Sequence, residues 1–479
     1  MLLKELLNVV KSELADLEIK GITSDSRMVK EGYAYICIKG TRFDGHDFAL
    51  SAKEQGAVAI IAEKDTGSGI DVIVEDTHAA YAVMSANWFD NPASKLKLIG
   101  VTGTNGKTSV TYMLKTVLEA AGEKVGLIGT IQNMIGDEVI ETERTTPDCF
   151  ELNKLFNKMV DKGCTAAVME VSSHALDQKR VYGIEFEVGI FTNLTQDHLD
   201  YHITMDNYLN AKKKLFSMCK TAVINKDDEW SQKLISGLSC NVVTLSGEDT
   251  FADYCAKDIE YKADGVQYTL CGNDEMDISI STGGKFSVYN SMSAAIAALN
   301  FGIPKEIVKK ALCSQNGVKG RAEVVKNPFD FTLIIDYAHT PDGLENILNT
   351  FIECKKGRLV VLFGCGGDRD KTKRPIMGKI AAEKADFVIV TSDNPRSENP
   401  SLIIEDILVG IKETTTPYRV IENRIDAIHY AIQNAQKDDI IILAGKGHET
   451  YQILADKTIH LDEREIIADA VRIRKDNVK

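Results

Sequence analysis

The sequence predicts an α/β protein of three domains whose sheets are mostly parallel. Its 479 residues are enough for about three domains of ordinary size. Short apolar runs with strand-like composition alternate with segments of helical periodicity, which is typical of parallel sheets covered by helices on both faces. Several of these runs end in polar clusters, where open α/β sheets bind their ligands.

The composition excludes several classes of protein. Hydrophobic residues make up 44% and charged residues 26%, which indicates a globular chain rather than a disordered one. A net charge of −14 gives no general attraction to nucleic acid or to an anionic membrane. The chain has no secretory signal and no run of 18 apolar residues, and its ten cysteines form no CxxC pair or zinc-type spacing. We therefore expect a cytoplasmic protein with reduced thiols.

The elements are predicted in chain order. An amphipathic helix is expected within residues 1–10, and further helices at 109–121, 292–301 and 377–384. Strands are expected at residues 33–39, 57–62, 72–74, 96–101, 166–171, 188–192, 331–336, 358–363, 387–391 and 439–444. Boundaries near residues 91–94 and 324–330 divide the chain into domains of residues 1–95, 96–324 and 325–479.

A glycine-rich loop after the fourth predicted strand is the strongest single motif. It reads Gly103, Thr104, Asn105, Gly106, Lys107, Thr108. Main-chain N–H groups in such a loop and at the following helix start bind phosphate, Lys107 can reach the β- and γ-phosphates of ATP, and the Thr108 hydroxyl suits Mg²⁺. The general pattern has glycine where this chain has Val101, so only the shorter loop is intact. The alternative is a glycine turn that happens to precede a Lys-Thr pair.

Four apolar runs in the last domain each end in a polar cluster. The clusters are Asp-Tyr-Ala-His at 336–339, Gly-Cys-Gly-Gly-Asp-Arg at 364–369, Asp-Asn-Pro-Arg at 393–396 and Gly-Lys-Gly-His-Glu at 445–449. The carboxyl ends of parallel strands meet at one edge of a sheet, so we expect the four clusters to form one ligand site. Each cluster alone is also compatible with a simple turn.

Together with three further motifs, the loop at 103–108 resembles the Mur ligase family. The motifs are Glu-Val-Ser-Ser-His at 170–174, Thr-Asn-Leu-Thr-Gln-Asp-His-Leu-Asp at 192–200 and Asp-Tyr-Ala-His-Thr-Pro at 336–341, in the family's order. The resemblance runs to about residue 449 and implies an ATP-dependent amide ligase of cytoplasmic peptidoglycan precursor synthesis. It also implies an N-terminal domain for a uridine nucleotide, a central P-loop ATPase domain and a C-terminal Rossmann-like domain for the incoming amino acid.

Within the family, the cluster at 393–396 resembles members that add meso-diaminopimelate. The carboxylate of UDP-MurNAc-L-Ala-D-Glu would attack the γ-phosphate of ATP, and the amine of the amino acid would then displace phosphate from the acyl phosphate. The expected partners are these three small molecules, with no nucleic acid and no membrane. No residue pattern sets the oligomeric state, and a monomer is the default expectation.

The resemblance also implies a catalytic and metal-binding set. The catalytic residues would be Lys107, Glu170, His198 and Lys212. Thr108, Glu170 and His198 would ligate Mg²⁺, and Lys212 would hold a second Mg²⁺ as a carbamylated lysine. Carbamylation requires a neutral amine, and therefore a lowered lysine pKa. The alternatives are helix capping for Glu170, a buried structural histidine at 198 and a solvated helix face at 212–214.

The remaining implied contacts are with the three substrates. The muramoyl dipeptide nucleotide would contact Ser24, Ser26, Thr41, Arg42, Phe43, Thr145, Thr146, Ser172, Gln178 and Arg180. Besides the glycine-rich loop, ATP would contact Asn290, Arg321 and Asp336. The incoming amino acid would contact Arg369, Asp393, Asn394, Pro395, Arg396, Gly445 and Glu449. The role of Arg144, where relatives often have asparagine, is left open.

Other functions remain open from sequence alone. The Arg396 fork suits the distal carboxylate of diaminopimelate, which L-lysine lacks, but ligation of L-lysine or another diamino acid is the nearest alternative. Folylpolyglutamate synthetase uses a similar loop, although the motif at residues 25–27 and the long segment before the loop count against it. An ATP-binding regulatory protein without ligase activity is the alternative from another class, and the intact catalytic set counts against it.

Overall fold

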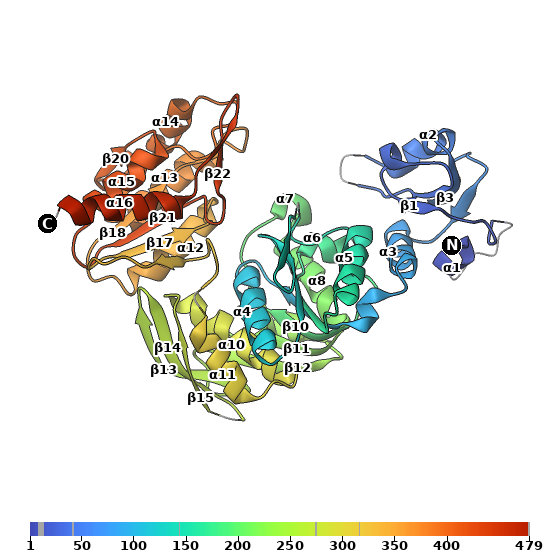
Figure 1. Cartoon of the computed structure of the whole chain (residues 1–479), viewed down its shortest axis with the longest axis horizontal. Helices are drawn as coiled ribbons and strands as arrows, with labels where there is room; N and C mark the ends of the chain where they lie inside the picture. The colour runs from blue at the N-terminus through green and yellow to red at the C-terminus, as the bar shows by residue number, and fades with distance from the viewer. Residues whose placement is uncertain (8–13, 41–42, 143, 274, 316, 478–479) are drawn as a thin grey trace. The chain divides into compact units, whose positions relative to one another are not determined.

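The computed structural model describes residues 1–7, 14–40, 43–142, 144–273, 275–315 and 317–477. Figure 1 traces this chain, which divides into two compact units: residues 1–245 with 293–307, and residues 246–292 with 308–479. Within the described part, no helix combines the length and the apolar content needed to cross a bilayer. All ten cysteines are free thiols.

The N-terminal part of the first unit is a small parallel sheet in the order β1-β2-β3-β4. Its strands are β1 (Gly21–Thr23), β2 (Tyr33–Ile36), β3 (Ala57–Ala62) and β4 (Asp71–Ile73), and its helices are α1 (Leu3–Leu6), α2 (Ala49–Glu54) and α3 (Thr77–Trp88). The three strands predicted here are therefore present. Of the helix predicted within residues 1–10, the structure shows α1, and residues 8–13 lie outside the described part.

A larger sheet follows, with parallel neighbours in the order β12-β11-β10-β5-β9-β6 and an antiparallel edge of β7 and β8. The strands are β5 (Lys97–Thr102), β6 (Val125–Ile128), β7 (Asn133–Ile135), β8 (Glu138–Ile140), β9 (Ala166–Glu170), β10 (Phe186–Phe191), β11 (Cys219–Asn225) and β12 (Asn241–Ser246). The helices are α4 (Lys107–Ala120), α5 (Cys149–Asp161), α6 (Ser173–Asp177), α7 (Leu199–His202), α8 (Met205–Lys213) and α9 (Ser231–Ile235). The strand order reverses at β5, which is where such sheets bind ligands.

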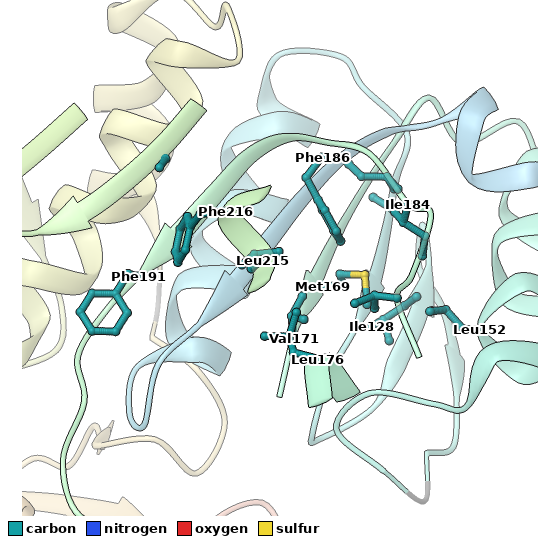
Figure 2. Packing of buried hydrophobic residues seen from close by; sticks show 14 of the residues in the cluster. Ile128, Leu152, Met169, Val171, Leu176, Ile184, Phe186, Phe191, Leu215 and Phe216 are labelled. Carbon is teal, nitrogen blue, oxygen red and sulfur yellow. The ribbon is translucent and has the colours of Figure 1, made fainter. Parts of the chain in front are cut away.

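Apolar packing makes the centre of this sheet a rigid platform. Figure 2 shows Met169 of β9 and Phe186 of β10 in one cluster with Leu152 of α5, Leu176 of α6 and Phe216, which follows α8. All five side chains are buried. The loops that leave the carboxyl ends of β5, β9 and β10 therefore start from well-fixed positions.

The second unit contains an antiparallel meander and the C-terminal sheet. The meander is β13 (Tyr254–Lys262), β14 (Gly265–Cys271) and β15 (Met276–Ile280). The C-terminal sheet has the order β16-β17-β21-β18-β19-β20, in which only β16 is antiparallel. Its strands are β16 (Glu323–Val325), β17 (Thr332–Asp336), β18 (Leu359–Phe363), β19 (Phe387–Val390), β20 (Tyr418–Val420) and β21 (Ile440–Ala444), followed by the hairpin β22 (Tyr451–Ile453) and β23 (Thr458–His460). Helices α10 (Lys285–Asn300) and α11 (Lys305–Ser314) contain residues of both units, and the remaining helices are α12 (Pro341–Ile352), α13 (Lys373–Lys384), α14 (Pro400–Ile411), α15 (Arg424–Gln433) and α16 (Glu463–Asn477).

Helices cover both faces of the C-terminal sheet. Leu359, Val361 and Phe363 of β18 pack in a cluster with α12, α13 and α14, whereas Val360 and Leu362 pack with α15 and α16. Alternate side chains of one strand thus enter two cores, as expected for a parallel sheet buried on both sides. The predicted α/β class with parallel-rich sheets is confirmed.

Close packing of α13 against α14 generates a stability prediction. A side-chain methyl at Gly410 would lie 1.8 Å from the main-chain oxygen of Pro375 and 2.8 Å from the nitrogen of Lys379. We expect Gly410→Ala to destabilise the C-terminal fold by about 2 kcal/mol, because the helices must separate to admit the methyl. Thermal unfolding followed by circular dichroism measures the change. Val409→Ala is the control, since Val409 is 59% exposed, and equal melting temperatures of the two variants would contradict the prediction.

Candidate active site

The glycine-rich loop joins β5 to α4 and is bonded to the segment that follows β10. The N–H groups of Thr104 and Asn105 donate to the main-chain and side-chain oxygens of Asn193, each at 2.9 Å, and the Thr192 hydroxyl donates to the Asn105 oxygen at 2.6 Å. Gly103 has φ 148°, and a methyl there would lie 1.9 Å from the Thr192 hydroxyl oxygen. Only glycine therefore allows this close contact of the two loops.

The side-chain nitrogens of two lysines share one carbonyl oxygen in this loop. The Nζ of Lys107, the first residue of α4, donates to the oxygens of Gly103 and Thr104, each at 2.8 Å. The Nζ of Lys212 on α8 also donates to the Gly103 oxygen, at 2.8 Å, and lies 4.4 Å from the ring centre of Tyr208. Lys212 is 1% exposed, and burial together with the charge of Lys107 holds its pKa well below the ordinary value. The alternative of a solvated helix face is therefore wrong for Lys212, whose neutral amine is favoured.

A buried carboxylate and hydroxyl lie beside this loop. Glu170, at the end of β9, accepts hydrogen bonds on Oε1 from the Thr108 hydroxyl and the Thr130 N–H, and on Oε2 from the Thr130 hydroxyl, each at 2.9 Å. Helix α6 is capped by Ser172 instead, whose hydroxyl accepts from the Ala175 N–H at 3.2 Å. The helix-cap alternative for Glu170 is therefore wrong. Paired carboxylate and hydroxyl oxygens are ligands that suit Mg²⁺.

His198 occupies the N-terminus of α7 in a left-handed conformation, with φ 53°. Its side chain is 48% exposed and its ring stands edge-on to His174, with 4.9 Å between ring centres, so the buried-histidine alternative is wrong. Within the described ranges, no hydrogen bond joins it to Thr108 or Glu170. The same ranges hold no group of three or more His, Cys, Asp or Glu side chains placed to bind a metal. The metal site that the sequence predicts also includes a hydroxyl ligand and a modified lysine, so it differs from a site made only of His, Cys, Asp or Glu. The Thr108 hydroxyl and the Glu170 carboxylate fit part of this predicted site.

The residues predicted to hold the muramoyl dipeptide form one connected cluster next to Glu170. Its members are Thr145, Thr146, Ser172, Gln178 and Arg180. Arg180 donates to the Thr146 oxygen at 2.8 Å and to the Gln178 side-chain oxygen at 2.6 Å, and the Thr146 hydroxyl donates to the Glu170 main-chain oxygen at 2.8 Å. Burial, and the neighbouring cation of Arg144, lower the pKa of Arg180. The Arg180 guanidinium suits an anionic ligand.

The predicted uridine residues lie in the small N-terminal sheet region. Ser26 begins a short helix that Asp25 caps, and Ser24 lies between this helix and the end of β1. Phe43 is 71% exposed. Thr41 and Arg42 lie outside the described residues.

Three residues predicted near ATP lie in the second unit. Asp336 ends β17 and accepts from the N–H groups of Ala338 at 2.8 Å and Ala322 at 2.7 Å, while burial raises its pKa. The Arg321 guanidinium lies 5.1 Å from the ring centre of Tyr337. Asn290 is buried on α10. Asp336 thus joins two loop segments at the carboxyl end of β17.

The four polar clusters of the C-terminal sheet meet at one edge, as predicted. The Gly445 N–H donates to the Asp336 oxygen at 3.0 Å, which joins the first cluster to the fourth. Asn394 donates to Glu449 Oε2 at 3.0 Å, and the fully buried Lys446 donates to both Asn394 Oδ1 at 2.8 Å and Glu449 Oε2 at 2.9 Å. The carboxylate of Glu449 is therefore fixed by an amide and an ammonium group.

Arg396 joins the second cluster to the third. Its Nη1 donates to the Gly367 oxygen at 2.9 Å, and its N–H donates to the Ile453 oxygen at 3.1 Å. Asp393 is nearly buried and accepts from the Asn394 N–H at 2.7 Å, with Pro395 between Asn394 and Arg396. The exposed Arg369 bonds through its own Nη1 to the Asp368 oxygen.

Known proteins match the chain over nearly its whole length. The matches are the Mur ligase family catalytic domain over residues 18–91, the Mur ligase middle domain over 101–298 and the Mur ligase, glutamate ligase domain over 320–447. A UDP-N-acetylmuramoyl-L-alanyl-D-glutamate--2,6-diaminopimelate ligase of Caldanaerobacter subterraneus subsp. tengcongensis is 51% identical over 98% of both chains. The chain belongs to the Mur ligase family. A Clostridium acetobutylicum ligase of the same name, numbered 1, is 50% identical over 98% of this chain and 99% of its own, and a solved ligase structure of that name is 30% identical, covers 99% of both chains and has a TM-score of 0.75.

Two residues of this Mur ligase site had no prior assignment from the sequence. Thr130 follows β6 outside every motif, yet it donates two hydrogen bonds to Glu170. Lys446 stands in a recognised cluster, but nothing local indicates that its ammonium is fully buried against Asn394 and Glu449. The contacts of Thr130 with Glu170 and of Lys446 with Asn394 join segments far apart in sequence. Only the contact of Lys446 with Glu449 is local. No periodicity or spacing along the chain reports such contacts.

A strained turn lies between the two helices that carry His198 and Lys212. Ile203 has φ 68° and ψ −45°, and the Thr204 N–H donates to the His202 oxygen at 2.8 Å, which makes Ile203 the centre of a γ-turn. A β-branched residue is strained in this conformation. Its side chain is 77% exposed, so little burial offsets the strain.

We therefore expect Ile203→Gly to stabilise this Mur ligase by about 1 kcal/mol. Relief of backbone strain outweighs the extra entropy that glycine gives the unfolded chain. The melting temperature, measured by differential scanning calorimetry, should rise. Ile203→Ala is the matched control, because it removes the side chain but keeps a Cβ at positive φ. A melting temperature no higher for Ile203→Gly than for Ile203→Ala would refute the strain argument.

Proposed function

We propose that this Mur ligase adds meso-diaminopimelate to UDP-MurNAc-L-Ala-D-Glu, with ATP converted to ADP and phosphate, in cytoplasmic peptidoglycan precursor synthesis. The observation that carries the proposal is the amino-acid site, where the Arg396 fork and the Glu449 carboxylate lie in linked clusters at one sheet edge. Relatives about half identical over nearly the whole chain carry the corresponding name. The proposed domains are residues 1–95 for the uridine nucleotide, 96–324 for ATP and 325–479 for the amino acid.

The first step requires two anions to approach each other. The substrate carboxylate attacks the γ-phosphate of ATP, a carbon-bound oxygen bonds to phosphorus, and ADP leaves. In the proposal, Lys107 reaches the phosphates once they displace its contacts with the loop, and the main-chain N–H groups of 103–108 hold them. Thr108, Glu170 and His198 would hold Mg²⁺, which when bound neutralises charge between the reacting groups.

Lys212 would hold a second Mg²⁺ after carbamylation. Its neutral amine attacks CO₂, a nitrogen–carbon bond forms, and one proton leaves to solvent. The product is an anionic, oxygen-bearing side chain of the kind that Mg²⁺ prefers. The burial and lowered pKa of Lys212 support this assignment.

Substrate contacts follow from the same arrangement. The cluster next to Glu170, with Arg180 and Arg144, would hold the muramoyl dipeptide so that its terminal carboxylate faces the phosphate loop. Ser24, Ser26 and the exposed Phe43 would contact the uridine part, with Thr41 and Arg42 beside them. Asn290, Arg321 and Asp336 are proposed to contact ATP.

The second step and its selectivity belong to the C-terminal clusters. The amine of the incoming amino acid attacks the acyl carbon, a carbon–nitrogen bond forms and phosphate leaves. Arg396 would bind the distal carboxylate and Glu449 the distal ammonium, with Arg369, Asp393, Asn394, Pro395 and Gly445 completing the site. L-lysine lacks the distal carboxylate and would leave the Arg396 guanidinium without that partner.

Phosphate release tests this function directly. With ATP, Mg²⁺ and UDP-MurNAc-L-Ala-D-Glu, we expect release with meso-diaminopimelate and little with L-lysine or no amino acid. Arg396→Ala should lower kcat/KM for diaminopimelate about 100-fold or more, because a charged hydrogen-bonding partner of the substrate is lost. Equal release with lysine would contradict the selectivity, and ATP binding without any amino-acid-dependent release would favour the regulatory alternative.

The role of Lys212 gives a separate prediction. Lys212→Gln should reduce turnover about 100-fold or more, because glutamine cannot form the anionic ligand. Lys213→Gln is the matched control on the adjacent residue, and we expect near-normal turnover from it. Carbon NMR after incubation with isotopically labelled CO₂ should show a carbamate signal that Lys212→Gln lacks. A signal of equal size in that variant would refute the modification at Lys212.

A further inference from the structure

We propose that Asp368, Ser397 and Glu398 are positioning residues that hold Arg396 in place and thereby set the selectivity for the incoming amino acid. This inference rests on the proposed function, because it assigns a purpose to the placement of Arg396. Asp368 belongs to the polar cluster at 364–369, and Ser397 and Glu398 directly follow the cluster at 393–396. The argument comes from hydrogen bonds between the loop at 364–369 and the loop at 393–398.

Arg396 is held in an unfavourable backbone conformation. Its φ is 52°, in the left-handed region that non-glycine residues rarely adopt. Such a conformation persists only where neighbouring contacts enforce it. Its Nη1 donates to the Gly367 oxygen at 2.9 Å and to the Asn394 oxygen at 3.5 Å, and its main-chain N–H donates to the Ile453 oxygen. The first of these depends on where the loop at 364–369 lies.

Asp368 joins the two loops immediately beside Arg396. Its Oδ2 accepts from the Ser397 N–H at 3.1 Å, and its Oδ1 accepts from the Ser397 hydroxyl at 2.6 Å. These hydrogen bonds hold the pKa of Asp368 below its ordinary value, so the carboxylate is ionised at neutral pH. The Gly367 N–H also donates to the Asn394 oxygen at 2.9 Å. Arg396 is therefore flanked on both sides by contacts between the loops.

Glu398 connects this pair of loops to helix α13. Its Oε1 accepts from the Asp368 N–H at 2.6 Å and from Nη2 of Arg374 at 2.9 Å, and its Oε2 accepts from Nη1 of Arg374 at 3.1 Å. Arg374 is 1% exposed on α13, and the hydrogen bonds from Arg374 and from the Asp368 N–H lower the pKa of Glu398 to about 2. A two-pronged contact between arginine and a carboxylate is directional as well as strong.

The consequence is a guanidinium whose position is set by a network that touches no substrate itself. A carboxylate-binding arginine must lie within a fraction of an ångström of its ligand for full effect. We call the hydrogen bonds of Asp368, Ser397 and Glu398 the bracket. Loosening the bracket should therefore weaken the contact of Arg396 with the distal carboxylate and leave the binding of ATP and of the nucleotide substrate unaffected. L-lysine, which has no such carboxylate, should gain relative to diaminopimelate.

The test compares steady-state kinetics of the full-length protein and its variants. The double variant Asp368→Asn with Ser397→Ala weakens the bracket, and asparagine tolerates the left-handed φ of 54° at that position. We expect KM for meso-diaminopimelate to rise about tenfold, KM for ATP and for the nucleotide to stay within about twofold, and the ratio of kcat/KM for diaminopimelate to that for lysine to fall about tenfold. In an Arg396→Ala background, the same two changes should have no further effect on that ratio.

Asp406→Asn is the matched control. Asp406 bonds to Arg374 at 2.9 Å but contacts neither loop, so this variant should keep wild-type selectivity even if its melting temperature falls. Glu398→Gln is a second variant and should shift selectivity in the same direction as the double variant.

An unchanged selectivity ratio in the folded double variant would overturn the proposal, as would an equal shift in the Arg396→Ala background. Wild-type protein without diaminopimelate-dependent phosphate release would instead refute the proposed function. Wild-type release together with variants of unaltered selectivity would refute only the bracket.

Discussion

Burial of parallel strands between layers of helices confines functional polar side chains to the strand ends. This constraint sets where the candidate site residues lie in both the central sheet and the C-terminal sheet. Strands β9, β18 and β21 are buried at every residue. Glu170, the cluster after β18 and the cluster after β21 come at or directly after their carboxyl ends. Because neighbouring parallel strands end at the same edge, residues distant in sequence meet there without any special folding of the loops.

Charge placement at these edges is the second shared feature. Lys107 and Lys212 converge on the Gly103 oxygen, and burial favours the neutral form of Lys212. In the C-terminal unit, Lys446 is buried against Glu449, and Arg424 against Glu463 with both side chains fully buried. A buried pair adds little net stability, but removing one partner is costly, so such pairs hold a fixed geometry. The two edges thus differ: one has Lys107 beside a buried lysine whose neutral form is favoured, and the other has compensated charges suited to an amino acid.

Strands and helices were predicted correctly from sequence where they form a continuous apolar run or a clear helical periodicity. The apolar runs of β5, β9 and β10, and those of β17, β18, β19 and β21, were predicted to within a few residues. Strands β6, β11 and β12 of the central parallel sheet were missed, and α4 begins at Lys107 rather than at the predicted 109. The meander β13–β15 was missed because its strands alternate apolar residues with charged ones such as Lys257 and Glu260, and so form no apolar run. Helix α10 was predicted from 292 but begins at Lys285, because its first turns are more polar than its later ones.

The sequence by itself determined the alternation of strands and helices, the phosphate loop and the four polar clusters, since each is written in neighbouring residues. Only the tertiary structure decided which lysine of the 212–214 run is buried, that Thr130 bonds to Glu170, and that Glu398 braces the Arg396 loop through Arg374. The Lys212 contact with Gly103 spans 109 residues, and that of Asn394 with Glu449 spans 55. Such contacts depend on how the strands stack in the sheets, and that arrangement depends on packing across the whole domain rather than on any local pattern.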